Sequence, residues 1–202
     1  MLRRGKDRDE ASLVGYDTDR LAVEAARRDP RLFEALYRKY VGQVYSFAFY
    51  ELRDPHAAED LTAQVFLRAL AGLPRFREQD PAPGSSFRVW LFQICRNAAS
   101  NERRRLRRHP EAALEEALVV AASDDVAQQA SDRDELRRAL RTIDGLPADR
   151  RRALVLRFVH EMSAREIGEI LGKSEAAVRV SIHRGLRSVA EQLGRHPRQP
   201  RN

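Results

Sequence analysis

Apolar residues recur along most of the chain at the spacing of helices, and no long segment alternates as a strand would. The clearest stripe repeats at intervals of three and four residues and comprises Phe33, Leu36, Tyr37, Tyr40, Val41, Val44, Phe47 and Ala48. Glycine and proline are sparse, with 10 and 9 residues. The pattern predicts an all-α protein whose first long helix is buried along this stripe.

Two more helices are predicted in the first half of the chain. Asp54 and Pro55 are typical of an N-cap and a first helical position. The apolar face of the helix they begin holds Leu61, Val65, Phe66, Ala69 and Leu70. Residues 72–86 are rich in Gly, Pro and Ser and predict a loop. The next amphipathic helix carries Phe87, Trp90, Leu91, Ile94, Cys95 and Ala98.

The composition then changes abruptly. Residues 96–108 contain six Arg and one Glu, whereas residues 109–132 contain six acidic residues and no Lys or Arg. Small residues without aromatics are typical of a weakly ordered linker. We therefore expect two small helical domains joined by an acidic flexible linker. The boundaries expected are a loose segment 1–20, a domain 21–108, the linker 109–132, a domain 133–193 and a tail 194–202.

The second domain contains the strongest local motif. Ser163 and Glu166 form the Ser-x-x-Glu pattern of a capping box, and Gly172 offers a left-handed helix end. Ser174 can cap the following helix, whose inner face is expected to hold Val178, Ile182, Leu186 and Val189. Two short helices joined by a three-residue turn with glycine predict a helix-turn-helix.

The outward positions of that second helix form a basic face. They are Lys173, Glu175, Ala176, Arg179, Val180, His183, Arg184 and Arg187. In a helix-turn-helix the second helix enters the major groove, and its N-terminal half meets the base edges. The alternative is a helical hairpin of ordinary kind whose arginines are only solvated.

A second candidate surface follows the aromatic helix that begins near Phe87. Its polar positions include Arg88, Arg96, Asn97, Arg103 and Arg104, and it adjoins the loop. Such a surface can hold a melted strand by phosphate contacts and stacking. Alternatively, Trp90 belongs to the core and the arginines are solvated.

Composition limits the other functions. The net charge is +7, and all of the 37 basic residues except Lys6, Lys39 and Lys173 are Arg. Arginine suits phosphate and guanine edges, although a GC-rich genome would also raise its share. Cys95 is the only cysteine, which excludes an intramolecular disulfide and favours a buried small hydrophobe.

Several classes of protein are not expected. No signal peptide or membrane-length apolar run is present, which favours a cytoplasmic protein without membrane insertion. We find no phosphate-binding glycine loop, no metal-ligand spacing and no nucleophile motif. We therefore expect no enzyme activity, no cofactor and no metal.

Three segments in this order resemble a known family. They are DPHAAEDLTAQVFLRAL, FRVWLFQICRNAASNERRR and LPADRRRALVLRFVHEMSAREIGEILGKSEAAVRVSIHRGL. They are similar to regions 2.2, 2.3–2.4 and 4 of extracytoplasmic-function sigma factors, and the resemblance covers about residues 30–108 and 133–193. It implies a transcription initiation factor whose partners are core RNA polymerase, promoter DNA and an anti-sigma factor.

The resemblance also implies roles for residues. Core polymerase would be bound by Asp60, Leu61, Gln64 and Phe66. The melted −10 element would be bound at the loop 75–86 and the following helix by Arg75, Ser85, Ser86, Arg88, Arg96, Asn97, Arg103 and Arg104. The −35 element would be read by Arg179, His183 and Arg184, and Lys173, Ser174 and Arg187 lie on the same outward surface. The acidic linker would run through the channel that the transcript later uses.

This chain departs from the family pattern at three places. Ala63 stands where glutamine is frequent, with Gln64 following it, and Val180 and Gly185 replace small polar residues and alanine. A helix-turn-helix regulator that acts without polymerase is the alternative function. It accounts for residues 133–193 and leaves residues 30–108 unexplained.

Overall fold

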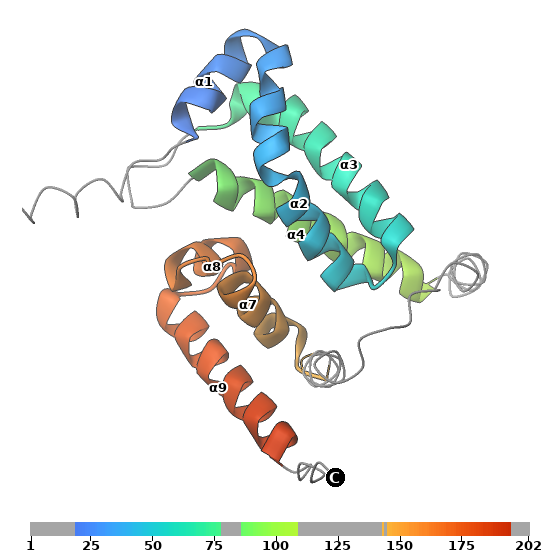
Figure 1. Cartoon of the computed structure of the whole chain (residues 1–202), viewed down its shortest axis with the longest axis vertical. Coiled ribbons are helices and arrows are strands. Elements are labelled where there is room, and N and C mark those ends of the chain that lie inside the picture. The colour runs from blue at the N-terminus through green and yellow to red at the C-terminus, as the bar shows by residue number, and fades with distance from the viewer. Residues whose placement is uncertain (1–18, 78–85, 109–142, 144, 195–202) are drawn as a thin grey trace, which may run out of the picture. The chain divides into compact units, whose positions relative to one another are not determined.

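The computed structural model describes residues 19–77, 86–108, 143 and 145–194, and its elements are all helical, as predicted (Figure 1). The elements are α1 (Arg20–Arg28), a 3₁₀ turn (Pro30–Phe33), α2 (Glu34–Leu52), α3 (Pro55–Gly72), a second 3₁₀ turn (Leu73–Arg75), α4 (Ser86–Arg108), α7 (Ala148–Phe158), α8 (Ala164–Leu171) and α9 (Glu175–Gly194). They belong to two compact units, one with α1–α4 and one with α7–α9.

The expected linker 109–132 lies outside the described residues, and so does almost all of the expected N-terminal segment and tail. The boundaries drawn from composition therefore stay predictions. Among the described helices, none combines the length and the apolar character that crossing a membrane requires.

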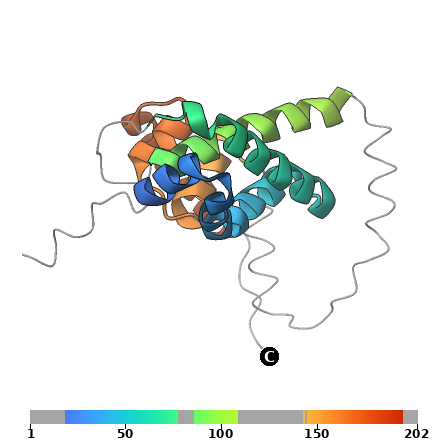
Figure 2. The same cartoon turned by 90° about the horizontal axis from the view of Figure 1, so that it is seen from above.

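The first unit is built around α2 and α3, with α1 beside the N-terminal end of α2 and the C-terminal end of α3 (Figures 1 and 2). The chain reverses between α2 and α3 at Arg53, whose φ of 61° is left-handed. Asp54 then caps α3, since its Oδ1 accepts a hydrogen bond from the Ala57 amide at 2.6 Å. Pro55 occupies the first turn, where its missing N–H costs nothing. The predicted start of this helix is confirmed.

Aromatic rings fill the core of the first unit. Phe47 of α2 meets Phe92 of α4 edge-on at 5.6 Å between ring centroids, and both rings are fully buried. Most of the predicted stripe on α2 is likewise buried. Val41 is half-buried, and Tyr37 is 43% exposed although its ring contacts Phe66 at 4.8 Å between centroids.

Part of the segment predicted as a loop over 72–86 is helical in the structure. α3 extends to Gly72, the 3₁₀ turn Leu73–Arg75 follows, and Leu73 and Phe76 are buried. The Phe76 ring packs on Trp90 at 4.8 Å between centroids. The glycine and proline residues correctly predicted the end of α3. They give no indication that Phe76 packs against aromatic residues of α4. Residues 78–85 lie outside the described residues.

The second unit contains the predicted helix-turn-helix. The Ser163 hydroxyl accepts from the Glu166 amide at 3.2 Å, and the Glu166 carboxylate accepts from the Ser163 amide at 2.8 Å. α8 ends at Gly172 with φ 68°, and the Ser174 hydroxyl accepts from the Ala177 amide at 3.2 Å. The capping box, the left-handed glycine and the second cap are all confirmed.

The inner face of α9 differs from the prediction. Val178 is fully buried and Ile182 is half-buried, but Leu186 is 45% exposed. Gly185 takes the inward place instead, because a Cβ built there would lie 3.0 Å from Leu154 Cδ1 of α7. The absence of a side chain at Gly185 thus lets α7 approach closely. Leu186 follows Gly185 directly and points about 100° away from it around the helix, which leaves its side chain 45% exposed.

Candidate polymerase and nucleic-acid interfaces

The exposed face of α3 carries two of the four predicted polymerase contacts. Asp60 and Gln64 are exposed and share a face, since they are four residues apart. Leu61 and Phe66 are 3% and 5% exposed and belong to the core. Leu67 is 67% exposed on the same face as Asp60, seven residues on. Leu67 is not among the residues predicted from the sequence, although its spacing of seven residues from Asp60 places it on the same helix face.

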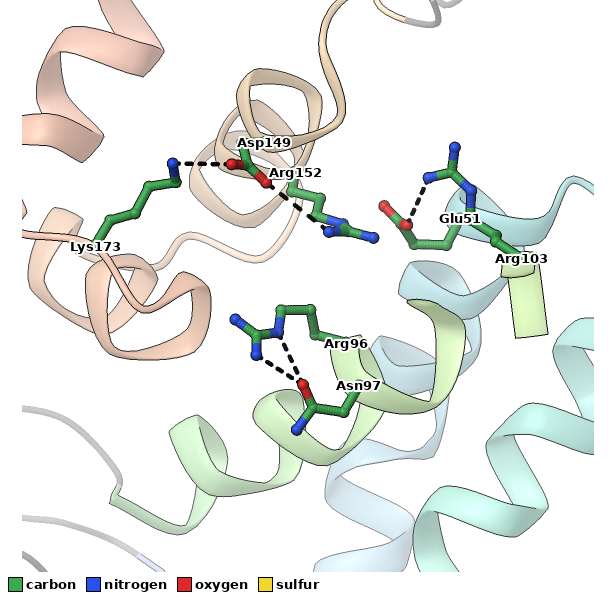
Figure 3. A network of polar contacts seen from close by, with 7 residues as sticks. All are labelled: Glu51, Arg96, Asn97, Arg103, Asp149, Arg152 and Lys173. Carbon is green, nitrogen blue, oxygen red and sulfur yellow. Dashed lines mark hydrogen bonds and ion pairs between the residues drawn. The ribbon is translucent and has the colours of Figure 1, made fainter. Parts of the chain in front are cut away.

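The predicted −10 surface is spread over the 3₁₀ turn and α4. Arg75 is exposed, Ser86 is the first residue of α4 and Arg88 is half-buried, while Ser85 lies outside the described residues. Further along α4, the Arg96 guanidinium donates to Asn97 Oδ1 at 2.7 and 3.2 Å (Figure 3). Arg104 is exposed, and its Nη1 donates to Asn101 Oδ1 at 3.3 Å.

Arg103 differs from these neighbours because it is paired with a buried carboxylate. Its Nη1 lies 3.3 Å from Glu51 Oε2 of α2 (Figure 3). The Glu51 side chain is 1% exposed and that of Arg103 is 26% exposed. Removing one member of such a pair leaves a buried charge uncompensated. Arg103 therefore joins α4 to α2, in addition to any contact that it makes with DNA.

Glu51 also influences the thiol beside it. Cys95 is fully buried, and burial raises its pKa far above the ordinary value, with the negative charge of Glu51 adding to the effect. The thiol is therefore protonated and inert at neutral pH, as the interpretation of Cys95 as a small buried hydrophobe predicts. Within the described residues no cluster of His, Cys, Asp and Glu could hold a metal ion.

The basic face of α9 is exposed along its length. Arg179, His183 and Arg187 recur every four residues, and Arg184 lies beside them. Arg179 pairs with Glu175, and Arg187 Nε lies 2.8 Å from Glu191 Oε1. Exposed pairs of this kind contribute about 0–1 kcal/mol, so either arginine can exchange its glutamate for DNA at little cost.

The turn before α9 is tied to α7. Lys173 Nζ lies 2.9 Å from Asp149 Oδ2, and Asp149 Oδ1 lies 3.9 Å from Arg152 Nη1 (Figure 3). Lys173 is exposed, and the Ser174 hydroxyl accepts the hydrogen bond that caps α9. Of the six predicted −35 residues, these two therefore also maintain the turn, while the other four present their side chains from α9.

The family comparisons agree with this arrangement. The model described as Sigma-70 region 2 matches residues 36–109, and the model described as Sigma-70, region 4 matches residues 136–189. CarQ of Myxococcus xanthus, an RNA polymerase sigma factor, is 33% identical over 80% of this chain and 89% of its own length. The extracytoplasmic-function sigma factor BldN of Streptomyces coelicolor is 28% identical over 95% of this chain and 69% of its own.

Among solved structures, CnrH in complex with the cytosolic domain of CnrY is similar. The match has a TM-score of 0.63 and 25% identity, and it covers 89% of this chain and 99% of CnrH. Two helical units, the second with a helix-turn-helix, define a sigma-70 type of initiation factor. The chain belongs to the extracytoplasmic-function RNA polymerase sigma factors of the sigma-70 family.

This assignment confirms the predicted family and function. The protein directs RNA polymerase to promoters for transcription initiation and is not itself a catalyst. The match to region 2 accounts for the first unit, which the alternative of a regulator acting without polymerase left unexplained.

Proposed function

We propose that α9 reads the −35 element through Arg179, His183 and Arg184. The observation that carries this proposal is that the arginine and histidine side chains of α9 are exposed along one face. The capped turn after α8 sets the position of α9. Arg179 lies near the start of α9, where a side chain reaches guanine O6 and N7 in the major groove. Arg187 lies two turns further along and meets phosphate.

Two variants separate base reading from phosphate contact. Arg179→Ala weakens binding to the native −35 element and flattens the preference at one base pair, by about 1–3 kcal/mol of discrimination. Arg187→Ala weakens binding to all sequences alike and lowers the salt slope by about one unit. Both holoenzymes are titrated against single-base −35 mutants at two salt concentrations. A uniform loss with Arg179→Ala would remove its role as a base reader.

The first unit is proposed to hold the melted −10 strand. Arg75 lies in the 3₁₀ turn after α3, Ser86 and Arg88 lie in the first turn of α4, and Ser85 lies outside the described residues. The Arg/Asn positions further along α4 are Arg96, Asn97, Arg103 and Arg104. Holoenzyme is expected to prefer single-stranded −10 non-template DNA to a scrambled strand. Each phosphate contact steepens the log–log salt slope by about 0.7. Equal binding of both strands at every salt concentration would contradict the proposal.

Core polymerase is proposed to dock on the α3 face that presents Asp60, Gln64 and Leu67. Leu61 and Phe66 support this face from the core, because their side chains are buried. Asp60→Arg is expected to abolish co-purification with core polymerase while leaving the helical content intact. The matched control is Glu59→Arg, an equal charge change at the preceding exposed position, which points about 100° away around the helix. Equal retention of both variants would reject the docking face.

An anti-sigma factor is proposed as a further partner in the cytoplasm. The support is the similar structure of CnrH, which was solved with the cytosolic domain of CnrY bound. Affinity purification of the tagged chain from its own cells, with and without stress, tests this proposal by mass spectrometry of what co-purifies. Recovery of core polymerase alone under every condition would count against an anti-sigma partner.

A further inference from the structure

Arg27, in the last turn of α1, reaches across the first unit to the turn that follows α3. Its Nε donates to the Leu73 carbonyl at 3.2 Å, and its Nη2 donates to the Phe76 carbonyl. The guanidinium carbon also lies 5.7 Å from the centre of the Phe76 ring. One side chain thus holds both ends of the 73–76 turn, which is 46 and 49 residues further along the chain.

The same turn is fixed from its other side by α4. The Phe76 ring packs against Trp90 and, at 6.0 Å, against Phe87. Gly72 lets Trp90 approach, since a Cβ at Gly72 would lie 3.0 Å from Trp90 Cζ2. The 73–76 turn is therefore clamped between the aromatic start of α4 and a single arginine from α1.

The clamp leads directly to exposed cationic side chains. Arg75 lies within the turn and Arg77 follows it, and both are exposed. Arg77 Nη1 donates to the Phe76 carbonyl at 3.3 Å, so Arg27 and Arg77 share this acceptor. A flexible turn would spread the Arg75 guanidinium over many positions, whereas a clamped turn fixes the Arg75 backbone and so narrows the region that the guanidinium can reach.

We propose that Arg27 is a positioning residue for binding of the melted −10 strand, acting through the 73–76 turn and Arg75. The proposal rests on the −10 role given above to the first unit. It also gives a function to α1, which precedes the residues 36–109 that match the region 2 model. Arg27 touches carbonyls and a ring, so it acts on the geometry of Arg75 rather than on phosphate.

Trp90 provides a direct measurement of the clamp, because it is the only tryptophan of the chain and contacts Phe76. In the full-length protein, Arg27→Ala is expected to increase acrylamide quenching of Trp90 fluorescence. Arg27→Lys keeps the charge and one donor and is expected to restore the shielding in part. Arg28→Ala, an exposed arginine next in the same helix, serves as the matched control and is expected to leave the quenching unchanged.

The functional test uses holoenzyme and two DNA probes. Arg27→Ala is expected to weaken binding to the single-stranded −10 non-template strand about tenfold, which corresponds to about 1.4 kcal/mol. Binding to a −35 duplex and co-purification with core polymerase stay unchanged, and these readouts would both fall if the variant had simply unfolded. Arg27→Lys is expected to recover part of the −10 affinity.

The outcomes separate this proposal from the one on which it depends. If Arg75→Ala weakens −10 binding and Arg27→Ala does not, the positioning role of Arg27 is wrong and the −10 surface stands. If neither change affects −10 binding, the −10 role of Arg75 is wrong, and the positioning role through it is wrong too. Loss of −10 binding by Arg27→Ala with normal Trp90 quenching would also overturn positioning, because the clamp would then be intact.

Discussion

The closest backbone approach in the helix-turn-helix is made possible by Gly168. This residue lies in α8, and a Cβ added there would be 2.6 Å from the Lys173 carbonyl oxygen. The turn is held in this place because the Lys173 amide donates to the Gly168 carbonyl at 2.9 Å. Because the contact is with a backbone atom, no change of side-chain rotamer can relieve the overlap. Gly168→Ala therefore requires α8 and the turn to move apart.

The loss of folding stability caused by Gly168→Ala can be estimated from two opposing effects. Overpacking of a well-packed site costs about 1–3 kcal/mol, and a clash with main chain belongs at the upper end. Alanine gains up to about 1 kcal/mol over glycine in a helix. The net loss of stability in the second unit is about 2 kcal/mol, which lowers the melting temperature of a small domain by roughly 8–16 °C.

The assay follows the two units of the full-length chain separately. Trp90 fluorescence reports the unfolding of the first unit, and far-ultraviolet circular dichroism reports helix in both. With Gly168→Ala the dichroism transition is expected to gain a low-temperature component while the Trp90 transition stays in place. Gly42→Ala is the control, because Gly42 has open space around its Cβ position and the change stabilises α2 by about 0.5–1 kcal/mol.

A Gly168→Ala protein that melts like the unmodified chain and binds a −35 duplex with unchanged affinity would refute this reasoning. It would mean that the turn between α8 and α9 has room for a methyl group. The position of α9 would then not depend on the short contact at Gly168.

Three further predictions concern stability and reactivity. Asp19 is 1% exposed and accepts from the Tyr40 hydroxyl, so Asp19→Ala is expected to cost the first unit about 1.5–3 kcal/mol, measured by the Trp90 transition. Ser163→Ala removes one half of the capping box and is expected to cost the second unit about 0.5–2 kcal/mol in the dichroism melt. Burial raises the pKa of Cys95, so the folded thiol is expected to resist a disulfide reagent at pH 8 and to react once denaturant is added. Because of this raised pKa the folded state keeps a proton that the unfolded state releases. The Cys95 contribution to stability is therefore fully present below the ordinary pKa of 9.0 and is lost as the pH rises above it, and Cys95→Ala is expected to remove that contribution.

Features encoded within a few residues could be predicted from the sequence. The capping box at Ser163, the left-handed Gly172 and the cap at Asp54 depend on neighbours that are at most four residues away. Backbone groups at a helix end need a partner at that distance, and only a few residue types supply one. The predicted helix starts at Asp54 and Ser163 and the predicted helix end at Gly172 are therefore found in the structure.

Features that depend on another helix could not be predicted in this way. Leu186 fits the apolar spacing of α9, yet it is exposed, and Gly185 is the residue that faces Leu154 of α7. Phe76 lies among loop-forming residues, but its partners are supplied by α4. Periodicity correctly predicted that Leu61 and Phe66 lie in the core. The resemblance implied that the same two residues bind polymerase, but exposed residues on α3 are better placed for that contact.

The arginines illustrate why composition alone overstates the DNA-binding surface. Arg27 and Arg157 donate to main-chain carbonyls, the latter to Met162 at 2.9 Å, and Arg103 pairs with a buried carboxylate. Arg179 and Arg187 are held only by exposed glutamates on their own helix. Arg27 and Arg157 hold main-chain groups of the folded units, and Arg103 stabilises the first unit in addition to the −10 contact proposed for it. The salt dependence of promoter binding is therefore expected to reflect arginines of the second kind more than those that hold the fold.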